Sequence, residues 1–279
     1  MENKRPSEGA AVEQAESDLQ ATVGRVGPRW IDALTEVPRA TVEAMSLGVS
    51  WLPLVATAQR GEPHHVFVLP GFMGGDRSTR PLREFLRRLN YDARPWEQGV
   101  NRGDLQQFER TVELFSKLYA QTQQPISLVG QSLGGVYARQ IAAVLPQAVR
   151  CVVTLGSPYQ AMSSSAANRV VARLFREISG QTIERARERV PLAAPLEVPA
   201  TSIYSRMDGI VGWQNCIEPE SALSENIHIY ASHAGMAVNP IILNLIADRL
   251  AQDPEAWCKY NERLDLKSSS QRPASQKRA

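Results

Sequence analysis

The sequence predicts an α/β fold in which a mostly parallel sheet of about six strands carries helices on both faces. Two observations predict it. Short apolar runs bounded by Gly or Pro recur from His65 onward, and stretches with apolar residues at spacings of three and four separate them. The runs are apolar throughout rather than alternating, which is typical of parallel strands covered on both faces. In such sheets, ligands bind beyond the carboxyl ends of the strands.

The elements alternate in regular order after an N-terminal segment, residues 29–58, whose helical pattern is interrupted by prolines. The predicted strands are "HVFVLP" (65–70), the weaker "YDARPW" (91–96), "ISLV" (126–129), "RCVVTLGSP" (150–158), and runs near "ATSIYS" (200–205) and "NIHIYAS" (226–232). The predicted helices cover residues 78–90, 104–122, 133–145 and 240–252. Asp104 can cap the second helix, with Gln107 at the position that completes a capping box. Pro240 suits the first turn of the last one.

Length and composition fit a globular protein with a sizeable core. The chain has 279 residues, of which 43% are hydrophobic and 22% charged. The formal net charge of +2 is too small to indicate nucleic-acid binding. The three cysteines are an odd number and lie far apart, which argues against a disulfide framework and against CxxC metal chemistry. A reducing, cytoplasmic compartment fits this pattern.

We expect one domain over residues 21–266, between a disordered N-terminus (1–20) and a basic disordered tail (267–279). The N-terminus is polar and shows no apolar core of a signal peptide. The tail holds basic residues and no acidic one, which leaves the rest of the chain slightly acidic. Its alternative interpretation is an arm that touches anionic lipid.

One apolar stretch, "VEAMSLGVSWLPLVATA" (42–58), has two interpretations. It contains Glu43, we expect it to be broken at Pro53, and it is shorter than a typical membrane-spanning run. The favoured interpretation is a segment packed on the domain. The alternative is peripheral contact with one side of a membrane.

The segment Gly130-Gln131-Ser132-Leu133-Gly134 connects a predicted strand directly to a predicted helix. A nucleophile elbow requires this context, because a sharp strand-to-helix turn lifts the serine hydroxyl above the sheet. The alternative is a Gly-rich turn that only links two elements. In the functional interpretation Ser132 is the nucleophile.

A serine hydroxyl needs a base to become an effective nucleophile, and the chain has four histidines. His64 and His65 lie at the amino end of the first strand, away from the serine. His228 lies inside a predicted strand and is interpreted as structural. His233 follows the last strand, on the same side of the sheet as the serine, and is the predicted base.

The base in turn needs a carboxylate that orients it and stabilises its charged form. Asp208 follows the "TSIYS" strand and precedes Gly209, which allows a turn there. Glu218 and Glu220, in the next loop, are the alternatives. The resulting order along the chain, Ser, Asp, His, is the one used in the α/β-hydrolase arrangement.

The oxyanion formed by serine attack needs preorganised hydrogen-bond donors. We expect one from the backbone N–H of Leu133, directly after the nucleophile. The second is expected in "LPGFMGGDRS", the loop after the first strand, where Phe72 is the favoured donor and Met73 the runner-up. The glycines of this loop allow it to fold close to the serine.

These segments together resemble the α/β-hydrolase superfamily, and most closely its bacterial esterases and triacylglycerol-lipase-like members. The resemblance is carried by "VLPGFMGGDRSTRPLREFLRRLNYDARPW", "SLVGQSLGGVYAR", "VTLGSPY", "YSRMDGIVGW" and "SHAGMAVNP", which span about 66–250. It implies an α/β-hydrolase fold with Ser132 as nucleophile, Asp208 as orienting acid and His233 as base. One departure is Pro70-Gly71 where many lipase-like members have His-Gly, so a side chain that helps hold the loop is missing.

Residues 159–199 stand where hydrolases of this type often insert a helical lid. The segment "NRVVARLFREISG" places apolar residues along one helical stripe that includes Phe175, and "MSSSAAN" before it could act as a hinge. A helix simply packed on the core is an equal alternative. We expect Phe175, Met73 and Trp213 to line an apolar substrate cleft.

The predicted function is a serine carboxyl-ester hydrolase, esterase- or lipase-like, that forms an acyl-enzyme from apolar acyl esters. Acyl transfer or thioester hydrolysis by the same triad is the alternative, and a non-catalytic binding protein is a third hypothesis from a different class. We expect no cofactor and no metal. The expected partners are a small-molecule or lipid ester and, in the alternative above, a membrane surface, with no nucleic acid.

Overall fold

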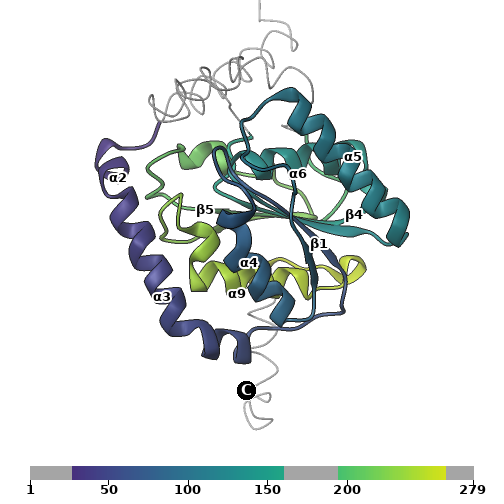
Figure 1. Cartoon of the computed structure of the whole chain (residues 1–279), viewed down its shortest axis with the longest axis horizontal. Coiled ribbons are helices and arrows are strands. Elements are labelled where there is room, and N and C mark those ends of the chain that lie inside the picture. The colour runs from purple at the N-terminus through teal and green to yellow at the C-terminus, as the bar shows by residue number, and fades with distance from the viewer. Residues whose placement is uncertain (1–26, 160–193, 262–279) are drawn as a thin grey trace, which may run out of the picture.

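Six parallel strands form one sheet in the computed structural model of the chain, which describes residues 27–159 and 194–261 (Figure 1). The strands lie in the order β2-β1-β3-β4-β5-β6. Their bounds are β1 His65–Leu69, β2 Asp92–Arg94, β3 Ile126–Gln131, β4 Val149–Leu155, β5 Ala200–Tyr204 and β6 Ser224–His228. All five neighbouring pairs are parallel, so every strand ends at the same edge of the sheet. The predicted parallel sheet of about six strands is confirmed.

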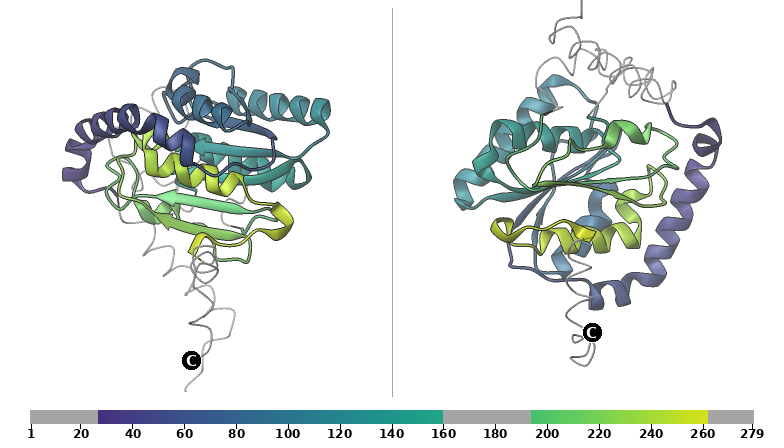
Figure 2. Two further views of the ribbon diagram at one scale, coloured as in Figure 1. Left: turned by 90° about the horizontal axis from the view of Figure 1, so that it is seen from below. Right: turned by 180° about the vertical axis from the view of Figure 1, so that it is seen from behind.

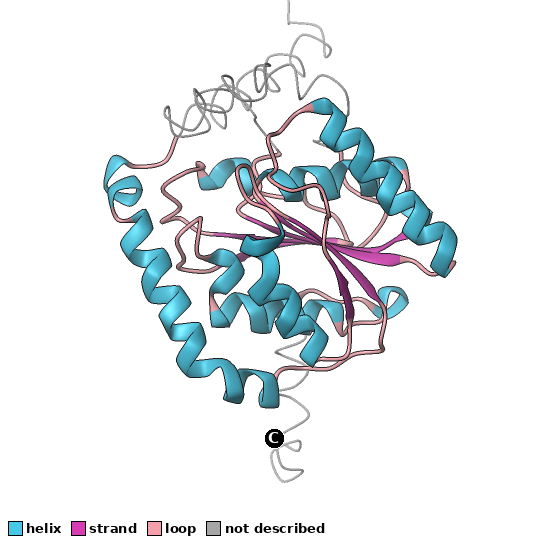
Figure 3. Ribbon diagram, viewed as in Figure 1, coloured by secondary structure: helices cyan, strands magenta, loops and turns pink. Residues whose placement is uncertain are grey.

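Helices cover both faces of this sheet, as Figure 2 and the secondary-structure colouring of Figure 3 show. Two of them, α5 (Leu105–Thr122) and α6 (Leu133–Val144), lie on one face. On the other face lie α4 (Asp76–Arg88) and α9 (Pro240–Leu250), with the long α3 (Glu36–Thr57) outside them. The other helical segments within the described residues are short: α2 Trp30–Leu34, η1 Pro146–Ala148, η2 Trp213–Cys216, η3 Met236–Val238 and η4 Pro254–Ala256.

Two apolar cores, one on each face, account for the uniformly apolar strands. Along β1, Val66 and Val68 belong to the core beneath α4 and α9, whereas Phe67 and Leu69 belong to the core beneath α5 and α6. Successive side chains of a strand point to opposite faces, so a strand covered on both sides must be apolar at every position. This burial fixes the sheet and therefore the edge at which the strands end.

The N-terminal segment forms a more regular helix than the sequence predicts. The expectation that the apolar stretch is broken at Pro53 is wrong, because α3 continues through Pro53 to Thr57. Proline removes only one backbone hydrogen bond from the helix. That loss is tolerated here because α3 is anchored along its length by buried Leu47 and Leu54 and by carboxylates described below.

The capping box predicted for α5 is only half formed. The Asp104 carboxylate accepts a hydrogen bond from Gln107 N at 2.8 Å, as expected of an N-cap. The Gln107 side chain, however, does not reach back to Asp104. It accepts from Arg102 N and donates to the carbonyl of Val100, so it fastens the preceding loop.

Three of the predicted segments lie outside the described residues. These are the N-terminus (1–20), the tail (267–279) and, apart from its two ends, the lid segment (159–199) with Phe175.

Candidate active site

Ser132 occupies a sharp corner between β3, which ends at Gln131, and α6, which begins at Leu133. Its backbone angles are φ 51° and ψ −120°, a region that residues other than glycine rarely adopt. The corner is held by backbone hydrogen bonds on both sides. Ser132 N donates to Leu155 O at 2.8 Å, and Gly135 N donates to Ser132 O at 3.0 Å. The strained serine is therefore fixed by the neighbouring strand and by its own helix.

The two glycines that flank Ser132 are required by close approach of the backbone. A Cβ atom on Gly130 would lie 2.4 Å from the carbonyl oxygen of Gly134. One on Gly134 would lie 2.3 Å from the carbonyl oxygen of Leu69. Neither position has room for a side chain, which explains the Gly-x-Ser-x-Gly spacing.

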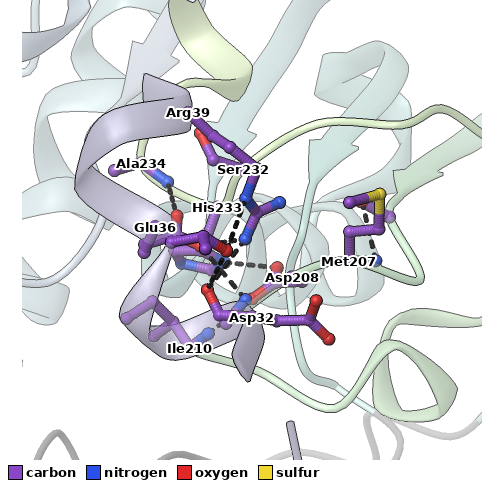
Figure 4. Close-up of polar contacts among 12 residues, drawn as sticks. Asp32, Glu36, Arg39, Met207, Asp208, Ile210, Ser232, His233 and Ala234 are labelled. Atoms are coloured by element: carbon purple, nitrogen blue, oxygen red, sulfur yellow. Dashed lines mark hydrogen bonds and ion pairs between the residues drawn. The ribbon is translucent and has the colours of Figure 1, made fainter. Parts of the chain in front are cut away.

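His233 and Asp208 meet beyond the carboxyl ends of β6 and β5 (Figure 4). His233 Nδ1 lies 2.6 Å from Asp208 Oδ2, and both residues are buried. The other carboxylate oxygen, Oδ1, accepts hydrogen bonds from the backbone N–H groups of Ile210 and Val211 at 2.8 and 2.7 Å. Both oxygens of Asp208 are thus engaged, so the carboxylate is held in the orientation that faces the imidazole.

The surroundings of His233 favour its charged form. Burial by itself lowers the pKa of His233, because it penalises the imidazolium. The charge of Asp208, its hydrogen bond and the charge of Glu36 act in the opposite direction and prevail, so the pKa of His233 is raised above its ordinary value. A ring in this environment accepts a proton readily when a nucleophile gives one up.

The loop after β4 brings the serine corner and the Asp208–His233 pair together. Leu155 accepts the backbone hydrogen bond of Ser132, and the next residue, Gly156, lies against the pair. A Cβ atom on Gly156 would lie 3.1 Å from both Asp208 Oδ2 and His233 Nδ1. In addition, Gln131 Nε2 donates to His233 O at 2.9 Å. The three predicted catalytic residues therefore share one edge of the sheet.

Among the described residues, no hydrogen bond joins the Ser132 hydroxyl to the His233 ring, whose bond to Asp208 uses Nδ1. Catalytic hydrogen bonds are often long in enzymes without substrate and tighten when substrate binds. The structure therefore brings acid and base into contact and places the serine at the same edge of the sheet, without that last bond.

The loop expected to supply an oxyanion donor lies against the nucleophile. A Cβ atom on Gly71 would lie 3.2 Å from Ser132 Cβ. The backbone N–H of Met73, the runner-up donor, is already used, because it donates to Asn101 O at 2.7 Å. This bond counts against Met73 as the oxyanion donor.

Asn101 holds this loop and was missed by the sequence analysis. It is fully buried, and its Nδ2 donates to Pro70 O at 2.8 Å. Its backbone N–H also donates to Gly74 O at 2.7 Å. It thus supplies the support that the Pro70-Gly71 departure removes. A lone asparagine after "WEQGV" carries no sequence pattern that could have pointed to this role.

Glu36, which Figure 4 shows beside His233 and Asp208, was also missed as a member of the site, as was Glu43 of the same helix α3. Glu36 accepts hydrogen bonds from Ala234 N at 2.8 Å and from Gly209 N at 3.1 Å. It therefore connects the residue after the predicted base with the residue after the predicted acid. Glu43 accepts from Ser232 N at 2.8 Å. Their spacing of seven residues, two helical turns, places both acids on one helix face and is the signal that could have revealed them.

The Glu36 carboxyl is costly to bury next to another acid. Burial raises the pKa of Glu36, as does the charge of Asp208, whereas the hydrogen bonds from Ala234 and Gly209 lower it. A buried carboxylate near Asp208 adds to the negative charge around His233. Glu36 is thus a positioning residue that also favours the imidazolium.

The alternative candidates have other partners. Glu218 forms a buried ion pair with Arg139 at 2.5 Å, and Glu220 is exposed. His64 Nε2 lies 2.8 Å from Ser127 Oγ, at the opposite end of the sheet. His228 ends β6, and its ring lies tilted against that of Tyr204 with centroids 5.4 Å apart.

The residues predicted to line a cleft are only partly described. The Met73 side chain is half exposed. Trp213 is half-buried and stacks on Tyr204 with ring centroids 5.6 Å apart, and the Arg206 guanidinium lies 5.1 Å from its centroid. Among the described residues, no group of three or more His, Cys, Asp or Glu side chains is arranged to hold a metal ion.

A sequence profile described as "alpha/beta hydrolase fold" matches residues 48–190, just over half of the chain. The chain belongs to the α/β-hydrolase fold family. This confirms the fold that the resemblance implied, with a first described strand at His65. No sequence among curated proteins matches this hydrolase.

Solved structures agree with this assignment at the level of the fold. Lipase B of Aspergillus fumigatus superposes with a TM-score of 0.56 at 18% identity, over 78% of this chain and 59% of the lipase. A structure reported for LipS and LipT, two metagenome-derived lipolytic enzymes, superposes with a TM-score of 0.52 at 18% identity, over 69% of this chain and 94% of its own. The chain thus spans less than two thirds of the fungal lipase.

Proposed function

We propose that this α/β hydrolase is a serine carboxyl-ester hydrolase acting through Ser132, His233 and Asp208. The observation that carries the proposal is the buried 2.6 Å contact between His233 Nδ1 and Asp208 Oδ2, at the same sheet edge as a serine held at φ 51°. A buried acid–base pair beside a strained serine is the arrangement that nucleophilic acyl chemistry requires.

The reaction follows from the roles of these groups. Ser132 Oγ attacks the ester carbonyl while His233 Nε2 takes the hydroxyl proton, and Asp208 stabilises the resulting imidazolium. His233 then gives the proton to the departing alcohol, which leaves an acyl-enzyme on Ser132. Water, deprotonated by His233, attacks the acyl carbonyl and releases the acid, which restores the serine.

The oxyanion of each tetrahedral intermediate is assigned to the backbone N–H groups of Leu133 and Phe72. Leu133 is the first residue of α6, so its N–H has no acceptor within the helix, and the positive end of the helix dipole favours a developing negative charge. The Phe72 loop touches Ser132 through Gly71 and is fixed by Asn101, which supports a preorganised donor.

Apolar acyl esters of short to medium chain length, or lipids, are the proposed substrates. The exposed Met73 side chain follows the proposed oxyanion loop, and the half-buried Trp213 follows Asp208 by five residues. The two similar solved structures are also named as a lipase and as lipolytic enzymes. These esters are therefore the first to test.

A panel of p-nitrophenyl esters from acetate to palmitate tests the proposal. We expect turnover of at least one ester, loss of it in Ser132→Ala, and wild-type turnover in the matched control Ser46→Ala, an exposed serine of α3. A fluorophosphonate probe should label the wild-type chain and the control but not Ser132→Ala. Turnover that survives in Ser132→Ala would refute the nucleophile, and absence of both turnover and labelling would favour the non-catalytic hypothesis.

A further inference from the structure

The outward face of α2 and α3 carries no exposed charged side chain between Arg29 and Arg60. Its large apolar side chains are instead strongly exposed, with Val49 at 87% and Leu52 at 79%. The full set of exposed large apolar residues on the two helices is Trp30, Ile31, Leu34, Val37, Val42, Met45, Val49 and Leu52. An exposed helix face of a soluble domain is normally polar, and a contiguous apolar one marks an interaction site.

The charged residues of the same segment point inward and are engaged there. Asp32 is buried and pairs with Arg29 at 2.7 Å. Glu36 and Glu43 bind the loops around His233, and Arg39 donates to the carbonyls of Ala231 and Asp32. On α2 and α3 the charged side chains thus face the protein, whereas on an ordinary surface helix they face the solvent.

Four of the five hydroxyls between Trp30 and Thr57 need no water as a hydrogen-bond partner, and the exposed Ser46 is the exception. Thr35, Thr41, Ser50 and Thr57 each donate to the carbonyl four residues earlier, at 2.7 to 3.0 Å. Hydroxyls satisfied by their own helix can enter an apolar phase without leaving a donor unpaired. This observation points to hydrocarbon rather than to a polar partner surface.

The ends of the face suit a lipid headgroup region. Trp30 is 74% exposed next to Arg29, and Arg60 lies at the other end, where it donates to the carbonyl of Arg88. Tryptophan and arginine at the borders of an apolar face are typical of helices that lie at a membrane surface.

The length of α3 also allows a membrane span, but its packing does not. By length and composition Glu36–Thr57 is the one described helix that could cross a bilayer. However, Leu47 and Leu54 are buried in the core beside α9, and Glu36 and Glu43 are bonded to the site. A helix fixed along one side can lie in the plane of a membrane surface but cannot pass through it.

We propose that the outward face of α2 and α3 binds the surface of a phospholipid bilayer, with both helices lying in its plane. Figure 1 and the right view of Figure 2 place them along one edge of the molecule, where a flat surface can reach them. The outward half of the 22-residue α3 offers about 600 Å², at the lower end of the about 600–1,000 Å² that each partner of a stable dimer buries. A bilayer requires no such complementary area, because apolar side chains insert individually.

Docking in this way places the candidate active site next to the lipid. The helix that touches the bilayer with one face holds the loops of Asp208 and His233 with the other. An ester dissolved in the bilayer would then be presented at the edge of the sheet that carries Ser132.

Co-sedimentation with phosphatidylcholine vesicles tests the inference, using the Ser132→Ala chain so that the result does not depend on turnover. We expect the chain to partition onto vesicles, and the double variant Val49→Asp/Leu52→Asp to lower the partition coefficient at least tenfold. The control Val144→Asp changes an exposed valine at the end of α6, on the opposite face of the sheet, and should bind like the parent. The milder pair Met45→Ser/Val49→Ser, which adds no charge, should lower partition by a smaller factor.

Three outcomes would overturn the inference. One is that the parent chain does not bind vesicles, and another is that both α3 variants bind them as well as the parent does. The third is a concentration-dependent dimer in lipid-free sedimentation that the double variant converts to monomer, since the face would then bind a second copy. Because ester turnover is not measured here, failure of the lipid inference and failure of the proposed enzyme activity remain distinguishable.

Discussion

Helices α5 and α3 cover opposite faces of the same sheet with opposite polarity. On α5 the apolar Phe115 is fully buried, while the exposed side chains include Glu109, Arg110, Glu113 and Lys117. On α3 the acids face inward together with Leu47 and Leu54, whereas Val37, Val42, Met45, Val49 and Leu52 face outward. The difference teaches that α5 stabilises the fold by burying its one apolar face, whereas α3 adds polar bonds to functional loops to the packing of Leu47 and Leu54.

The largest effect is expected at the group that α3 supports. In Asp208→Asn the hydrogen bond to His233 loses its charge and favours the wrong ring tautomer, so kcat of the ester assay should fall on the order of 10⁴-fold. The melting temperature should stay close to that of the parent, because the side-chain shape is kept. A loss of less than tenfold would show that Asp208 does not orient the base.

The next effect tests the α5 side of the comparison. Phe115 lies with its ring centroid 6.3 Å from that of Phe67 and has no exposed surface. Phe115→Ala should therefore lower the free energy of unfolding by about 3–5 kcal/mol, measured by urea denaturation. A cost below about 1 kcal/mol would mean that the core beneath α5 collapses to fill the cavity or contributes little.

A smaller effect is expected from the inward face of α3. Glu36→Gln can accept only one of the two backbone hydrogen bonds and removes a negative charge near His233. We expect kcat to fall about 10-fold, by analogy with the loss of one buried hydrogen bond. The matched control is Glu113→Gln on the exposed face of α5, which should leave kcat unchanged.

The pH profile separates a positioning role of Glu36 from a purely structural one. The base must be neutral, so kcat/KM falls as the pH drops through the raised pKa of His233, and the acid limb lies above about 6.5. Without the Glu36 charge this pKa is lower, so the acid limb of Glu36→Gln should move to lower pH. An unmoved limb would assign Glu36 to folding alone.

The smallest effect completes the comparison on the outward face of α3. Val49→Ser changes a side chain that is 87% exposed, so the free energy of unfolding should change by less than about 0.5 kcal/mol. Urea denaturation without lipid is the measurement. A loss above about 1.5 kcal/mol would show that Val49 packs against part of the folded chain.

The sheet and its carboxyl edge could be predicted from sequence patterns, because strands buried on both faces are apolar at every position. Strands such as Val66–Leu69 are apolar at every position, and the corner at Ser132 requires glycines on both sides. Once the strands are located, their carboxyl ends indicate where Asp208 and His233 lie. That is why acid and base could be paired across 25 residues of sequence.

The features that could not be predicted are those that depend on contacts between distant segments. Periodicity locates one apolar face of a helix and assumes that the rest is polar, but on α3 large apolar side chains also lie on the outward side. Pro53 was expected to break the helix, but α3 continues through it because buried Leu47 and Leu54 anchor the helix on both sides of the proline. Asn101 acts through a fold-dependent contact with Pro70, which no local pattern encodes.

The double attachment of Asn101, through its main chain to Met73 and Gly74 and through its side chain to Pro70, has a practical consequence for engineering. The conformation of segment 70–75 is not determined by that segment alone, because it depends on hydrogen bonds to Asn101 in segment 96–103. Segment 70–75 transferred alone into another protein should therefore be flexible. Transfer of both segments together should preserve the conformation of the loop.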